Sequence, residues 1–247
     1  MEWICPVDYD LKYKTFIRQR YSDTGDWFLQ DPRFREWEKS NDATLLCQGH
    51  PGAGKTILTT VVIHHLRKTS NRACHPTAFI YCDYLRQSEQ SADHMLSSLL
   101  RQIVEIHPVV PKPVRDCYHL HKEKRTEPLS EEIKQLLETT LDSLEALTVV
   151  VDALDECELH VCEEFLSTIE NLRERHGVRL FAMSRIMRTI ASLSIFSEIP
   201  SLEIRASNQD VQRYTSSRVK ELRGLVRSDS AFCKEITSKV TDASGGM

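Results

Sequence analysis

The sequence predicts an α/β protein whose parallel sheet carries helices on both faces, and three observations in its 247 residues lead to that prediction. Short apolar runs of the kind found in buried strands alternate with longer stretches that repeat apolar residues at helical spacing. One run, 43–47, leads into a glycine-rich loop and then into an apolar helix at 57–66. Another run, 147–151, ends in Asp152, as expected where a buried parallel strand reaches the ligand-binding edge of a sheet.

The expected elements follow one another in a regular order. Strands are predicted at 43–47, 76–82, 147–151, 178–183 and 201–204. Helices are predicted at 8–21, 32–37, 57–66, 92–106, 114–122 and 130–144. Asp31 can cap the second of these helices with Pro32 in its first turn, because the proline lacks an N–H that would need a partner. Ser91 can cap the fourth in the same way.

Charge and composition narrow the range of functions. A net charge of -4 gives no general reason to expect binding to nucleic acid or to a membrane surface. No apolar run approaches the roughly 20 residues that span a bilayer, and the first residues lack the basic start and apolar stretch of a signal peptide. We therefore expect a cytoplasmic protein. Its 8 cysteines show no C-x-x-C pair, so we expect reduced, mostly buried thiols.

The glycine-rich loop fills every fixed position of the phosphate-binding pattern G-x-x-x-x-G-K-[ST]. Its glycines allow backbone N–H groups to point inward, and the N-terminus of the next helix adds partial positive charge, so both favour a phosphate chain. Lys55 is expected to reach the β and γ phosphates, and the Thr56 hydroxyl to bind Mg²⁺. The expected nucleotide-binding residues are Gly49, His50, Pro51, Gly52, Ala53, Gly54, Lys55, Thr56 and Ile57.

A second motif follows the strand at 147–151. Asp152 is placed to hold Mg²⁺, because that small, hard cation prefers carboxylate, phosphate and water oxygens. Glu156, with Asp155 beside it, is the candidate to orient and polarise an attacking water. The alternative is that Asp155 and Glu156 are acids at a helix N-terminus, where the helix dipole also favours them.

The strand at 178–183 leads to Ser184 and Arg185. An arginine at the carboxyl edge of a central strand can contact a γ-phosphate, and its planar fork suits that task. It can equally pair with a nearby acid, and the sequence leaves both interpretations open. The candidate catalytic residues are therefore Lys55, Asp155, Glu156 and Arg185.

Aromatic residues gather before the first strand. Phe34 and Trp37 stand three residues apart and share one face of the predicted helix. Packing on the edge of the nucleotide domain is favoured for this segment, because aromatic residues at helical spacing are usually core. The alternative is that the segment covers the nucleotide base.

Cys157, His160 and Cys162 invite a zinc interpretation. On a helix, Cys157 and His160 share a face while Cys162 points elsewhere. No second ligand pair stands at structural-zinc spacing, so a metal centre is not favoured here.

Three stretches together, 49–56, 149–156 and 181–185, resemble the NACHT class of STAND signal-transduction NTPases. The stretch 24–29 and the glycine loop are similar to the nephrocystin-like N-terminal NTPase module common in fungal ankyrin-repeat and other repeat proteins. Residues 208–214, which open a helix after the last strand, also resemble this family. The resemblance covers nearly the whole chain.

The resemblance implies a P-loop NTPase, a three-layer sandwich with sheet order 5-1-4-3-2 preceded by N-terminal helices. It implies an N-terminal helical segment at 1–40, an NTPase core at 41–206, and C-terminal helices at 207–247 that begin a truncated helical subdomain. It also implies ATP or GTP binding, slow hydrolysis, and switching between a closed and an oligomerising state. No T-K-x-D or N-K-x-D guanine-reading motif occurs, which leans toward ATP.

Two classes of function follow from these patterns. The first is a regulatory NTPase that hydrolyses Mg-ATP slowly as a signalling switch. The alternative is a hydrolytically inactive scaffold whose nucleotide only stabilises the fold. A kinase is a third class, although nothing in the sequence resembles a lid for an acceptor substrate. The expected partners are a nucleoside triphosphate, proteins bound through missing flanking domains, and a second copy of the chain, without nucleic acid or membrane.

Overall fold

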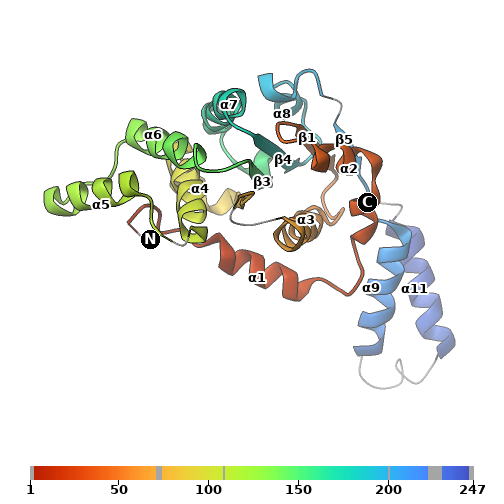
Figure 1. Cartoon of the computed structure of the whole chain (residues 1–247). Coiled ribbons are helices and arrows are strands. Elements are labelled where there is room, and N and C mark those ends of the chain that lie inside the picture. Colours follow the sequence, from red (N-terminus) through yellow and green to blue (C-terminus); the bar gives the residue numbers. More distant parts are fainter. Residues whose placement is uncertain (1–2, 71–73, 108, 200, 222–229, 245–247) are drawn as a thin grey trace.

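The computed structural model describes residues 3–70, 74–107, 109–199, 201–221 and 230–244. Within them, a five-stranded sheet forms the centre of the molecule (Figure 1). Its strands are β1 (Thr44–Gly49), β2 (Thr77–Tyr81), β3 (Leu147–Asp152), β4 (Val178–Ser184) and β5 (Leu202–Ile204). All neighbouring strands are parallel in the order β2-β3-β4-β1-β5, which confirms the predicted fold class and the order 5-1-4-3-2.

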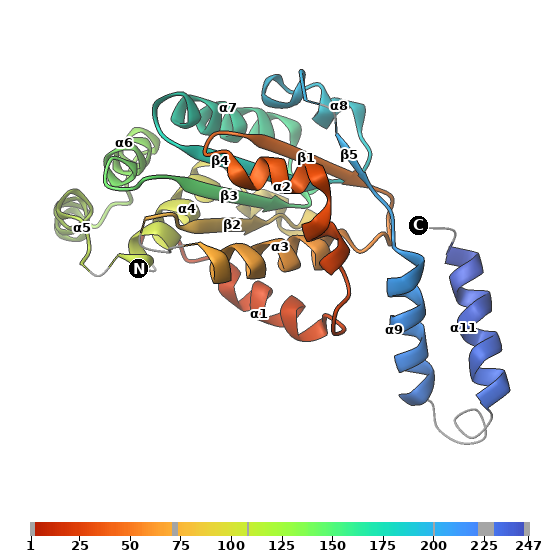
Figure 2. The ribbon, with the colours of Figure 1, turned by 45° about the vertical axis from the view of Figure 1, so that its right-hand side comes forward.

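Helices cover both faces of the sheet and make it the middle of three layers (Figures 1 and 2). The helices of one face are α1 (Tyr9–Gln19), α2 (Pro32–Lys39) and α3 (Lys55–Thr69). Those of the other face are α4 (Ala92–Ile106) and α7 (Leu159–Arg175), with α6 (Ser130–Leu141) packed on α4 and α5 (Lys112–Lys124) against α6. Shorter helical turns are η1 (Asp26–Gln30), η2 (Tyr84–Glu89), η3 (Leu154–Glu156), α8 (Arg188–Ala191) and η4 (Ser194–Phe196).

Helix ends follow local chemistry. The Asp31 side chain caps α2 with Pro32 in the first turn, and the Ser91 hydroxyl caps α4, as predicted. Helix α6 begins as expected but ends at Leu141, not at residue 144. The reason is that the N–H groups of residues 143 and 144 bond to carbonyls three residues back, so the chain leaves the helix in a tighter turn.

The aromatic residues of α2 belong to the core. Phe34 and Trp37 are 0% and 3% exposed, and the Trp37 ring packs edge-on against Phe181 of β4. The Trp37 indole Nε1 donates to the carbonyl oxygens of Ala43 and Leu180, at 3.1 and 3.0 Å. Packing, not base covering, is therefore confirmed for these two residues.

Gly49 ends β1 where β5 comes closest. A Cβ at this position would lie 2.6 Å from the Ile204 carbonyl oxygen, and a strand backbone cannot step aside as a side chain does. We expect Gly49→Ala to lower the free energy of unfolding by about 1–3 kcal/mol by forcing the two strands apart. Urea unfolding measures this change, and an unaltered midpoint would show that β5 adjusts freely.

Helices α9 (Asn208–Glu221) and α11 (Ser230–Ser244) pack against each other and extend from the sheet (Figure 2). The first residues of α9 lie near the glycine loop and the N-terminal segment, because all three contribute to one cavity. In the described part of the chain, every helix is too short or too polar to cross a lipid bilayer.

Candidate functional site

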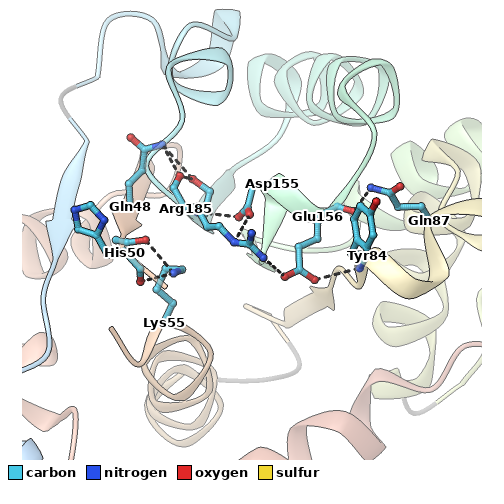
Figure 3. Close-up of polar contacts among 10 residues, drawn as sticks. Gln48, His50, Lys55, Tyr84, Gln87, Asp155, Glu156 and Arg185 are labelled. Atoms are coloured by element: carbon cyan, nitrogen blue, oxygen red, sulfur yellow. Dashed lines mark hydrogen bonds and ion pairs between the residues drawn. The ribbon is translucent and has the colours of Figure 1, made fainter. Parts of the chain in front are cut away.

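The loop between β1 and α3 takes its shape from glycines. Gly52 and Gly54 have φ of 84° and 83°, in the left-handed region that side chains disfavour. Gly54 leads directly into α3, whose first residue is Lys55. The Lys55 Nζ donates to the carbonyl oxygens of Gly49 and His50, both at 2.9 Å (Figure 3). The loop therefore closes around an ammonium group at the N-terminus of a helix.

A cavity of about 380 Å³ opens beside this loop at the carboxyl edge of β3 and β4, and it brings most of the candidate residues together. Its lining residues are Pro51, Gly52, Gly54, Lys55, Thr56, Ile57, Asp152, Ala153, Asp155, Glu156 and Arg185. Ala53 lines a neighbouring cavity, whereas Gly49 and His50 line neither of the two. Partial burial lowers the pKa of Lys55, and the nearby Asp155 carboxylate acts in the opposite direction.

Asp152 ends β3 and is 3% exposed. Its Oδ1 accepts a hydrogen bond of 2.6 Å from the Thr59 hydroxyl. Burial raises the pKa of Asp152 to about 6, while hydrogen bonds from Thr59 and Thr56 act to lower it. Thr59 is a residue of the site that the sequence motifs did not predict. The signal was present, because Thr56 and Thr59 stand three residues apart and so share the face of α3 that meets β3.

Ala153 turns the chain sharply after Asp152. Its φ of 53° is uncommon for a residue with a side chain, and the short turn η3 begins there. This turn places both acids beside Arg185. The Arg185 Nε lies 3.2 Å from Asp155 Oδ2, and the Arg185 Nη2 lies 3.2 Å from Glu156 Oε1 (Figure 3). The Arg185 backbone N–H also donates to Asp155 at 2.8 Å. Arg185 is therefore paired with the acids of the site itself.

Gln48 links the end of β1 to the segment that follows β4. Its Nε2 donates to the Ser184 hydroxyl and to the Arg185 carbonyl, each at 3.1 Å (Figure 3). Gln48 was likewise not predicted as a residue of the site. Its signal is a lone amide at the end of an apolar strand, directly before the phosphate-binding pattern.

Glu156 is also held from η2. The Tyr84 backbone N–H donates to Glu156 Oε2 at 3.1 Å, and Gln87 Nε2 donates to the Glu156 carbonyl at 2.8 Å (Figure 3). The two carboxylate oxygens of Glu156 thus have different partners, the guanidinium of Arg185 on one and a backbone N–H on the other. Nothing in the sequence marks Tyr84 or Gln87 for this contact.

A second cavity, of about 450 Å³, shares Gly52, Gly54 and Ile57 with the first and is mostly apolar. Its remaining lining comes from the N-terminal segment, from Ala53 and Leu58, from Ala206 and Ser207, and from the two C-terminal helices. Trp27, which is 37% exposed, lines this cavity, unlike the buried aromatic residues of α2. Covering of a nucleotide base stays a prediction for Trp27, which belongs to the stretch 24–29 before α2.

Cys157, His160 and Cys162 do not come together as a group of metal ligands. Cys157 Sγ packs against Cys82 Sγ at 3.4 Å, whereas His160 is exposed and lies 3.3 Å from Glu158. Throughout the part of the chain that the structure describes, no group of three or more His, Cys, Asp or Glu residues is placed to hold a metal ion. The thiols are mostly buried, as predicted.

Comparison with known proteins gives a curated relative and similar solved structures. The vegetative incompatibility protein HET-E-1 of Podospora anserina is 29% identical over 142 residues, which cover 55% of this chain and 10% of that protein. The chain thus spans about a tenth of that relative's length. A structure of the Aeropyrum pernix ORC1 protein in complex with DNA is 16% identical, with a TM-score of 0.47, over 73% of this chain and 44% of that one.

The replication initiator DnaA, bound to AMPPCP and single-stranded DNA, is 16% identical, with a TM-score of 0.44, over 89% of this chain and 61% of that one. The family described as nephrocystin 3, N-terminal, matches residues 23–185. That range is more than half of the chain, and it contains the glycine loop, Asp152 and Arg185. The chain therefore belongs to the nephrocystin 3 N-terminal family and forms a NACHT-like, nucleotide-binding module of the P-loop NTPase type.

Proposed function

We propose that this chain binds a nucleoside triphosphate with Mg²⁺ and hydrolyses it slowly, as a conformational switch in signalling. The observation that carries this proposal is the gathering of Lys55, Thr56, Asp152, Glu156 and Arg185 around one cavity at the carboxyl edge of the sheet. In open α/β sheets this edge is where ligands bind. The name of the relative, a vegetative incompatibility protein, supports a role in signalling.

The donor atoms at this cavity suit Mg²⁺. The Thr56 hydroxyl and the Asp152 carboxylate are hard oxygen donors that line the same space. Burial raises the pKa of Asp152 to about 6, so a divalent cation would supply a counter-charge that hydroxyl groups alone do not. These two residues would hold the ion, which when bound neutralises charge on the phosphates.

The glycine loop would hold the phosphate chain. Within residues 49–57, Gly52, Gly54 and Thr56 line the cavity at the N-terminus of α3, where backbone N–H groups favour phosphate, and Lys55 adds a full positive charge. The carbonyl oxygens of Gly49 and His50 keep the Lys55 ammonium group at the loop. The adjoining apolar cavity suits a nucleotide base. ATP is the favoured nucleotide because the guanine-reading motif is missing from the sequence, and GTP is the alternative.

For hydrolysis, we assign Glu156 to orient the attacking water and Arg185 to bind the γ-phosphate. A γ-phosphate would compete with Asp155 and Glu156 for the guanidinium group. Release from Arg185 frees the Glu156 carboxylate to accept a hydrogen bond from water. Asp155, whose side chain is 3% exposed, would keep Arg185 oriented through its backbone N–H.

We also assign roles to the segments of the chain that surround the site. We assign the NTPase core to 41–206, with the flanking segments 1–40 and 207–247 closing the base end of the nucleotide site. Both flanking segments contribute to the second cavity, which supports this assignment. Protein partners would act through further flanking domains, a second copy of the chain is another expected partner, and the cytoplasm is the expected location.

The test is binding of fluorescent ATP and GTP analogues with Mg²⁺ to the wild type and to Lys55→Ala. Loss of the ammonium group removes a charge-assisted contact, so we expect affinity to fall by about ten- to a hundredfold. Lys68→Ala, in the last turn of the same helix, is the matched control and should bind like the wild type. Equal affinities of the wild type and Lys55→Ala would exclude the glycine loop as the phosphate site.

A further inference from the structure

One carboxylate of α9 holds the N-terminal loop. Asp210 Oδ2 accepts hydrogen bonds from the Gly25 backbone N–H at 2.8 Å and from the Trp27 indole Nε1 at 3.0 Å. These partners lie 185 and 183 residues away in the sequence. Gly25 has φ of +80°, and a Cβ there would lie 2.9 Å from a Leu58 methyl group. The loop therefore passes closely between α3 and Asp210.

This contact lies in the lining of the 450 Å³ cavity. Gly25, Trp27 and Asp210 all line it, together with Gly52 and Gly54 of the phosphate-binding loop. The lining residues come from three distant parts of the chain: the N-terminal segment, the glycine loop with α3, and the C-terminal helices. The shape of the cavity consequently depends on how α9 and the N-terminal loop are held together.

Other contacts between α9 and the loop are weaker. Arg213 Nη1 donates to the Asp23 carbonyl at 3.1 Å, but Arg213 is exposed, and contacts of exposed charged groups contribute little. Asp210 is only partly exposed and accepts two N–H groups at once. Hydrogen bonds to a charged acceptor are among the stronger ones, so Asp210 dominates the junction.

The same geometry argues against Asp210 as a base-reading residue. A carboxylate that selects guanine uses both oxygens side by side on two neighbouring N–H groups of the base. Asp210 Oδ2 already accepts from Gly25 and from Trp27. Asp210 therefore acts on a ligand through the loop that it holds.

We propose that Asp210 is a positioning residue that clamps residues 24–27 as a wall of the base cavity, so that docking of α9 and binding of the nucleotide base favour each other. This inference rests on the proposed nucleotide site. If the base binds better when the wall is in place, then by linkage a bound nucleotide also strengthens the contact between α9 and the loop. The phosphates take no part in this coupling.

Two ligands separate the base from the phosphates: Mg-ATP and Mg-tripolyphosphate, measured by calorimetry on the full chain. Asp210→Ala should weaken ATP binding by about tenfold or more and leave tripolyphosphate binding unchanged. Asp210→Asn keeps an oxygen acceptor without the charge, so it should recover part of the ATP affinity. Asp242→Ala, an exposed acid of α11, is the matched control and should bind both ligands like the wild type.

Trp27 provides a spectroscopic readout of the clamp itself. Its emission should change when ATP binds to the wild type, and this change should be lost in Asp210→Ala. Trp27→Phe replaces the indole and its N–H by a smaller aromatic ring, and it identifies which signal belongs to this residue among Trp3, Trp27 and Trp37. It should weaken ATP binding in the same direction as Asp210→Ala, and it serves as the test if that variant does not fold.

Several outcomes would overturn the inference. Equal weakening of ATP and tripolyphosphate would indicate general damage to the site, and selective loss of GTP over ATP would make Asp210 a base-reading residue. A wild type that binds neither ligand would overturn the proposed function as well. An effect of Lys55→Ala without any effect of Asp210→Ala would overturn only the clamp.

Discussion

Glu156→Gln is expected to slow nucleotide hydrolysis by about a hundredfold or more, because a neutral amide polarises water far less than a carboxylate does. Nucleotide binding should persist. The amide oxygen can still accept the Tyr84 N–H that Glu156 accepts at 3.1 Å. Loss of the ion pair with Arg185 also leaves the guanidinium more available to a γ-phosphate, so affinity should stay the same or rise.

Phosphate release in single-turnover experiments measures the hydrolysis rate, and a fluorescent analogue measures binding separately. Glu158→Gln is the matched control, because this exposed acid at the start of α7 lies two residues away and outside the cavity. It should hydrolyse at the wild-type rate. Equal residual rates in wild type and Glu156→Gln, with binding intact in both, would instead favour the hydrolytically inactive scaffold.

Asp152→Asn is expected to change function and stability in opposite directions. Mg²⁺-dependent nucleotide binding should be lost, because a neutral amide is a poor ligand for a small divalent cation. Stability should rise, because burial raises the pKa of Asp152 to about 6, so the carboxylate that prevails near neutral pH is less favourable in the folded chain than in the unfolded one. The Thr59 hydroxyl can still donate to the amide oxygen, so this buried donor keeps its acceptor.

The stability gain should depend on pH with a definite sign. The folded chain binds the Asp152 proton more tightly than the unfolded chain, since burial raises the pKa from 3.8 to about 6. The contribution of Asp152 to the free energy of unfolding of the wild type is therefore highest at low pH. It falls as pH rises from about 4 to about 6 and then stays level. In urea unfolding, the free energy of unfolding of Asp152→Asn should exceed that of the wild type by about 1–3 kcal/mol near neutral pH. The difference should be small at about pH 4. A less stable variant at neutral pH would show that the carboxylate stabilises the fold.

The fold could be predicted because its determinants are local. Apolar runs, a glycine loop and capping residues such as Asp31 and Ser91 act within a few residues of where they stand. The end of α6 was misplaced because its last apolar residue, Leu144, continues the helical spacing beyond the turn at residue 143. The spacing of apolar residues does not show where backbone hydrogen bonds begin to reach three residues back and so end the α-helix.

The sequence allowed prediction of those site residues that stand at the ends of strands. Asp152 and Arg185 follow strands that turn out to be neighbours, so their positions at one edge follow from the topology. Contacts between side chains of different elements could not be read in this way. Gln48 and Asp210 have their partners more than a hundred residues away, and no local pattern encodes such a pairing.

Leu85 stands in η2 next to Tyr84, and its side chain is 90% exposed. Glu156 shares its carboxylate between Arg185 and the Tyr84 N–H, so it cannot turn far toward an attacking water without releasing one of them. When the bond to Tyr84 is released, the turn that carries Leu85 loses one of its anchors. The proposed hydrolysis inside the molecule would then have a mechanical output at its surface, in an exposed apolar side chain that a partner protein could contact.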